Sequence, residues 1–127
     1  MTSKWKPLFA SGELVNDYEP LRLYLEEARS RGREDLVEKA LLTQDDFTHL
    51  LDTMRVTSNL LDLIEKLKPR FLERIDGEIA REAFKKMGLE VDANFARERI
   101  AYIMACWLLE AGKHWKILSF KELPKDP

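Results

Sequence analysis

The sequence predicts an all-α protein, a compact bundle of about five helices with an arm at each end. Apolar residues recur along most of the chain at spacings of three and four, which is the period of a helix rather than a strand. Glycine and proline number only five each, so few positions interrupt these patterns. Hydrophobic residues make up 45% of 127 residues, which is enough for one core and one domain.

We expect a single helical domain over 1–127, with an N-terminal arm at 1–16 and a C-terminal tail at 113–127. Both ends carry aromatic residues, and they are more apolar than free chain ends need to be. We therefore interpret these aromatic side chains as contacts for a partner. The alternative for the two tryptophans is that each packs into the core while its neighbouring lysines reach solvent. The candidate partner-binding residues are Trp5, Phe9, Trp115 and Phe120.

The first two helices are expected at about 18–31 and 34–42. The first has an apolar face, and Gly32 suits its end because glycine tolerates the left-handed backbone found there. The apolar face consists of Leu21, Tyr24, Leu25 and Ala28. The second helix is short and carries Leu36, Val37, Ala40 and Leu41.

The longest periodic segment predicts one continuous helix over about 44–68. Thr43 followed by Asp46 has the shape of a capping box, which marks a helix start. Pro69 is expected to stop or kink this helix. Its apolar seam consists of Phe47, Leu50, Met54, Thr57, Leu61 and Ile64.

The next helix is expected at about 70–87 and ends before Gly88. Its buried stripe is Leu72, Ile75, Ile79, Ala83 and Met87. Four basic residues fall within about 60° of each other on the opposite side of the same helix, a ridge about 22 Å long. The ridge is either a solvated charged face or a contact for phosphates. The candidate nucleic-acid-binding residues are Arg70, Arg74, Arg81 and Lys85, with Lys113 and Lys116 from the tail.

The last long helix is expected at about 93–111, with Asp92 as its N-cap and its end before Gly112. The run from Ile100 to Leu109 is apolar on all sides, which predicts a helix covered from several directions at the centre of the bundle. That run is about half as long as a bilayer span needs. Cys106 lies within it, and we expect a buried, unreactive thiol.

Charge and cysteine content exclude some classes of function. The 21 basic and 23 acidic residues give a net charge of −2, so overall charge does not favour a polyanion or a membrane surface. One cysteine allows no intrachain disulfide, and no apolar signal core follows the first lysines, so we expect a cytoplasmic protein.

Asp45 and His49 share a helix face, but a metal site needs at least three ligands. We therefore expect no metal, no cofactor and no catalytic residues.

A two-helix DNA-binding motif is a weaker interpretation of residues 42–60. Its spacing is about three residues too long, and its turn contains no glycine. The second helix would also present Asp62 and Glu65 to the phosphates. These carboxylates would repel the phosphates, since both are negatively charged.

These observations favour a non-catalytic small helical subunit or adaptor that acts by packing against a partner in a larger assembly. The alternative is a helical subunit that grips a nucleic-acid phosphate backbone within a ribonucleoprotein or DNA-processing complex. In size and fold class alone, the chain is similar to the small all-helical subunits of RNA-guided CRISPR complexes, which implies such a role without any shared residue motif. We expect a protein partner or self-association, and no membrane.

Overall fold

The computed structural model describes residues 19–114, and only the backbone of the last two of these. It confirms the predicted all-helical class: within this range the chain forms six helices and no strand. The helices are α2 (Glu19–Ser30), α3 (Glu34–Ala40), α4 (Gln44–Met54), α5 (Leu60–Leu72), α6 (Gly77–Lys86) and α7 (Ala93–His114). The partner-binding aromatics predicted in the two chain ends lie outside the described residues.

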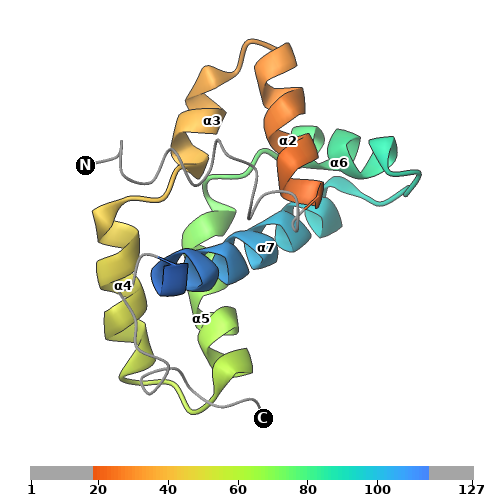
Figure 1. Cartoon of the computed structure of the whole chain (residues 1–127). Helices are drawn as coiled ribbons and strands as arrows, with labels where there is room; N and C mark the ends of the chain where they lie inside the picture. The colour runs from red at the N-terminus through yellow and green to blue at the C-terminus, as the bar shows by residue number, and fades with distance from the viewer. Residues whose placement is uncertain (1–18, 115–127) are drawn as a thin grey trace.

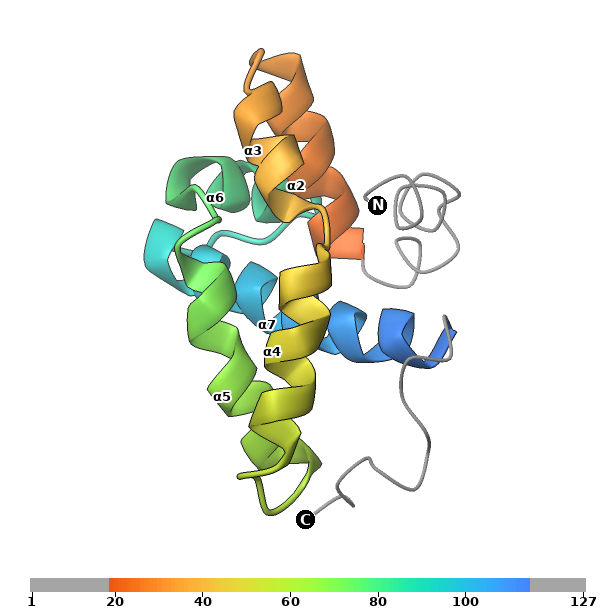
Figure 2. The same ribbon diagram turned by 90° about the vertical axis from the view of Figure 1, so that its left-hand side faces the viewer.

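Helix α7 is the central element of the fold. It crosses the middle of the molecule, with α2, α3 and α6 above it in these views and the pair α4 and α5 running across it (Figures 1 and 2). It contacts α2, α4, α5 and α6, as its lack of a polar face predicted. The helix continues through Gly112 to His114, so the predicted end at residue 111 is wrong.

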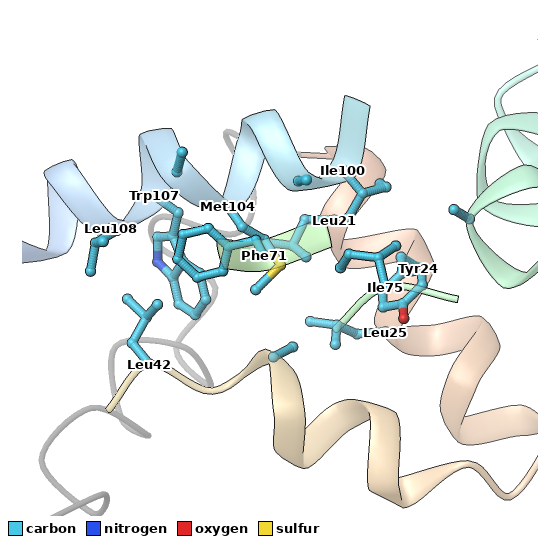
Figure 3. Packing of buried hydrophobic residues seen from close by; sticks show 14 of the residues in the cluster. Leu21, Tyr24, Leu25, Leu42, Phe71, Ile75, Ile100, Met104, Trp107 and Leu108 are labelled. Carbon is cyan, nitrogen blue, oxygen red and sulfur yellow. The ribbon is translucent and has the colours of Figure 1, made fainter. Parts of the chain in front are cut away.

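The core is one cluster of buried side chains contributed by all six helices and the segment between α3 and α4. Figure 3 shows part of it, where side chains of α2 and α7 lie close to Leu42, Phe71 and Ile75. Trp107 of α7 is 1% exposed and is among the largest side chains in this cluster, together with Tyr24 and Phe71. The predicted apolar face of α2 is fully buried. Cys106 is half-buried rather than buried, and burial raises the pKa of its thiol.

The prediction of one continuous helix over 44–68 is wrong, because the chain turns between α4 and α5. Asn59 adopts an extended conformation, and its side chain accepts a hydrogen bond of 2.8 Å from the backbone N–H of Asp62. In return, the backbone N–H of Ser58 donates to the Asp62 carboxylate at 3.1 Å. These local bonds start a new helix. As a result Leu61, predicted on the apolar seam, is 49% exposed.

Pro69 was expected to stop or kink a helix, but it does not stop α5, which continues past it to Leu72. Proline has no backbone N–H, so the carbonyl of Glu65 loses its helical donor. Both residues are exposed, so water has access to this part of the helix.

The prediction of one helix over 70–87 is also wrong, because the link 73–76 separates α5 from α6. The Asp76 carboxylate accepts hydrogen bonds of 3.0 Å from the backbone N–H groups of Glu78 and Ile79, and so caps α6. The buried Tyr24 hydroxyl accepts a bond of 3.0 Å from the Asp76 N–H, which fixes the link against α2. Met87, predicted in the buried stripe, is 38% exposed.

Other predicted helix ends are confirmed. Thr43 and Asp46 form both bonds of a capping box at the start of α4. The Asp92 carboxylate accepts a bond of 2.7 Å from a backbone N–H in the first turn of α7. Gly32 and Gly88 follow α2 and α6 with φ of 73° and 82°, the left-handed region that glycine tolerates.

Replacement of Asn59 by alanine is expected to lower the free energy of unfolding by about 1 kcal/mol, because α5 loses its side-chain cap. Equilibrium urea denaturation measures this loss. Gln44→Ala is the control, since this residue is exposed at the start of α4 and its change should stay within about 0.5 kcal/mol. An Asn59→Ala protein as stable as the control would show that this cap does not hold the turn.

Candidate functional site

The structure separates the basic residues that the sequence placed on one ridge. Arg70 lies in α5, Arg74 in the link that follows, and Arg81 and Lys85 in α6. The single-helix ridge is therefore wrong, because the break at 73–76 changes the direction of the chain between the two pairs. Of the two predicted tail contacts, Lys116 and the Lys113 side chain lie outside the described part of the structure.

Arg70 and Arg74 instead converge on one buried carboxylate, that of Asp46. The Nε of Arg70 donates to Asp46 Oδ1 at 2.8 Å. The terminal nitrogens of Arg74 donate to the two oxygens at 2.5 Å and 3.1 Å. The Asp46 side chain is fully buried, whereas those of Arg70 and Arg74 are 29% and 19% exposed. The three residues form a charged cluster between the first turn of α4 and the end of α5.

The position of each member follows from local structure. The capping box places Asp46 in the first turn of α4, where its carboxylate also accepts a bond of 2.8 Å from the Thr43 N–H. Arg70 and Arg74 are four residues apart and so lie on one side of the end of α5. Arg74 stacks on the Phe71 ring at 4.9 Å, which fixes its plane.

Burial alone would raise the pKa of Asp46. The hydrogen bonds from Arg74 and Arg70 outweigh that effect, so the pKa of Asp46 lies below its usual value. Asp46 is therefore ionised at neutral pH, and its charge offsets part of the charge of the two arginines.

A cleft of about 470 Å³ opens beside this cluster. Its lining is mainly basic: His49, Lys66, Pro69, Arg70, Glu73 and Arg74. Burial and the nearby charge of Arg70 lower the pKa of His49, so this imidazole is neutral at pH 7. The Lys66 ammonium donates to the Asp62 carboxylate at 3.1 Å and to the Val56 carbonyl at 2.8 Å.

A second cleft of about 360 Å³ adjoins the first, since Glu73 and Arg74 line both. Its other lining residues are Glu38, Lys39, Leu41 and Thr43. It contains two carboxylates and two basic groups, so it has no excess of either charge. The first cleft is the more basic of the two.

The other two residues of the predicted ridge have different surroundings. The Arg81 guanidinium donates to Glu78 at 2.8 Å within the first turns of α6, an exposed pair of small energetic value. Lys85 is exposed and forms no ion pair with another described residue. These two residues remain on the surface, as predicted. They lie in α6 and take no part in the Asp46 cluster.

An apolar surface lies where α6 turns into α7, and we call it the α6–α7 corner. It consists of Met87, Leu89 and Phe95, which are 38%, 46% and 50% exposed, with the half-buried Val91. The Phe95 ring packs edge-on against Phe84 at 6.4 Å between centroids. This surface was not predicted from the sequence, which placed Met87 in a buried stripe. Its signal was the number of apolar residues close to Gly88, in a link where polar residues are the norm.

The structure also bears on metal ligands and membrane-spanning helices in the described part of the chain. Within residues 19–114, no group of three or more histidine, cysteine or acidic side chains is placed to hold a metal ion. No helix in this part of the chain has the length and apolar character needed to cross a bilayer. Comparisons of the chain with protein families, curated proteins and solved structures find no match.

Proposed function

We propose that the protein is a non-catalytic helical subunit or adaptor that binds a partner protein through the α6–α7 corner. The observation that carries this proposal is the clustering of exposed apolar groups. Among the described residues, three of the five large exposed apolar side chains lie in this corner. Groups of exposed apolar side chains are typical of protein interaction sites, and methionine and phenylalanine are enriched there.

The corner is also held in place before any partner binds. Phe95 is fixed on its inner side by Phe84, whose own side chain is 5% exposed and belongs to the core. Asp92 caps the helix that carries Phe95. A preformed surface loses less conformational entropy on binding than a flexible one, which favours affinity. The aromatics of the chain ends stay part of this proposal as additional contacts.

The alternative function, contact with a nucleic-acid backbone, remains a prediction with less support than before. Such contact would require the four basic residues to be aligned on one helix. Two of them, Arg70 and Arg74, are bonded to Asp46, and Arg81 is bonded to Glu78. The surface that would follow a phosphate backbone is therefore interrupted.

Replacement of both Leu89 and Phe95 by glutamate is expected to abolish partner binding, because two charges would have to be buried at the interface. The full chain is purified with its partners from its native host, in wild-type and variant forms, and the contact is then reconstituted from the two purified proteins. Light scattering over a wide concentration range tests whether the partner is a second copy.

The matched control is Val56→Glu with Leu61→Glu, which charges the exposed apolar residues at the turn between α4 and α5. This control should bind like the wild type, and circular dichroism should show that all variants remain helical. A Leu89→Glu, Phe95→Glu protein that keeps the same partner and the same oligomeric state would overturn the proposal.

A further inference from the structure

We propose that the cleft beside Asp46 binds a phosphate group through Arg70 and Lys66. The proposal concerns a different surface from the α6–α7 corner and does not depend on it. The shared chemistry is a single phosphate, either free in solution or exposed on a nucleic-acid strand.

Arg70 has donors available for a phosphate, because Asp46 holds only one edge of its guanidinium. The Nε donates to Asp46, whereas the two terminal nitrogens make no hydrogen bond to another described residue. The side chain is 29% exposed and lines the cleft. A buried carboxylate therefore fixes this guanidinium with its terminal donors still available, and a pair of such donors matches two oxygens of a phosphate.

Lys66 and Arg74 add positive charge to the same cleft. Both line the same cleft as Arg70, one turn away on either side along the chain. Two bonds to Asp62 and Val56 hold the Lys66 ammonium in place, and a lysine ammonium has three N–H donors, so one is left. The Arg74 fork is used by Asp46, so Arg74 contributes charge rather than a second fork.

The negative charge of Glu73 opposes phosphate binding, so its removal tests the proposal. Glu73 is the acidic residue among the six that line the cleft, and it is exposed. Its charge repels an anion in the cleft. Removal of that charge should strengthen phosphate binding, an outcome that partial unfolding of a variant does not produce.

The test is a titration of the full chain with inorganic phosphate, followed by backbone amide chemical shifts, against sodium chloride at equal ionic strength. Saturable shifts are expected around residues 66–74 and at His49. Glu73→Gln is expected to bind about two- to fivefold more tightly, the effect of one exposed charge. Arg70→Gln is expected to bind at least about tenfold more weakly, because charge-assisted hydrogen bonds are lost. Lys66→Gln leaves the Asp46 cluster intact and should also weaken binding.

The matched control is Lys85→Gln, which removes one exposed positive charge outside the cleft and should leave the affinity unchanged.

A second titration uses a short single-stranded oligonucleotide in place of phosphate. Shifts at the cleft with both ligands identify a backbone phosphate as the ligand, and shifts with phosphate alone identify a free phosphate. No saturable shift, or equal affinity in the Glu73→Gln, Arg70→Gln and Lys85→Gln proteins, would overturn the proposal. The Leu89→Glu, Phe95→Glu protein should bind phosphate normally, so failure of either proposal is distinguishable from failure of the other.

Discussion

Replacement of Trp107 by alanine is expected to lower the free energy of unfolding by about 3–5 kcal/mol, the usual cost of a large-to-small change in a core. The Trp107 side chain is 1% exposed and belongs to the buried cluster. It lies on α7, which contacts four other helices, so a cavity there is not filled by the movement of one neighbour. A loss of this size is a large part of the stability of a small domain.

Urea denaturation followed by circular dichroism measures this effect independently of the removed fluorophore. Phe95→Ala is the matched control, because it removes an aromatic ring from the same helix at a position that is 50% exposed. The control should lose about 1 kcal/mol. A Trp107→Ala protein that loses no more than the control would show that Trp107 does not fill the core and that α7 is not the central helix.

The sequence was sufficient to predict features that depend on local patterns. The apolar face of α2, the capping box at Thr43 and the all-round apolar character of α7 each follow from residues within a few turns of one another. The spacing of apolar residues did not reveal the turn before α5, because apolar residues continue at helical spacing across that turn. At that point a capping residue competes with helix continuation. Packing against the rest of the fold decides such a competition, and this packing is not visible in a local pattern.

The candidate site likewise contains a contact that no local sequence pattern could reveal. The sequence identified Arg70 and Arg74 as neighbours on one face, and the structure places both beside the same carboxylate. It could not identify that carboxylate, because Asp46 precedes Arg70 by 24 residues. In sequence, Asp46 has the pattern of an ordinary capping residue, which is normally solvated. The return of the chain along α5 brings Arg70 and Arg74 against it, and the folded protein leaves Asp46 buried.

Replacement of Asp46 by asparagine is expected to lower the free energy of unfolding at pH 7 by about 3 kcal/mol, the lower end of the range for breaking a buried ion pair. Asparagine has a similar shape, and its side-chain oxygen still accepts the bond from the Thr43 N–H. The variant therefore removes the charge while retaining the cap. The two guanidinium groups lose their counter-charge, but they keep some contact with water, which moderates the loss.

Asp45→Asn is the matched control, because it removes the same charge from the adjacent, exposed position in the first turn of α4. Its loss should be below about 1 kcal/mol, the value of one charge near a helix end. Equal losses in the two variants would show that Asp46 contributes only through the helix terminus and that its bonds to Arg70 and Arg74 add nothing.

The pH dependence of stability provides a second measurement on the same pair of proteins. The pKa of Asp46 is lower in the folded protein than its value of about 3.9 in an unfolded chain. Its contribution is therefore complete above that unfolded pKa and is lost as the pH falls through the folded pKa. The stability difference between wild type and Asp46→Asn should shrink as the pH falls below about pH 4. His49, whose pKa the charge of Asp46 affects, titrates at higher pH and does not account for a change in that range. Other carboxylates with lowered pKa values, such as Glu27 and Asp62, are common to both proteins and cancel in this difference. A difference that stays constant down to pH 2 would mean that the charge of Asp46 does not stabilise the fold, and that the arginines are held by other contacts.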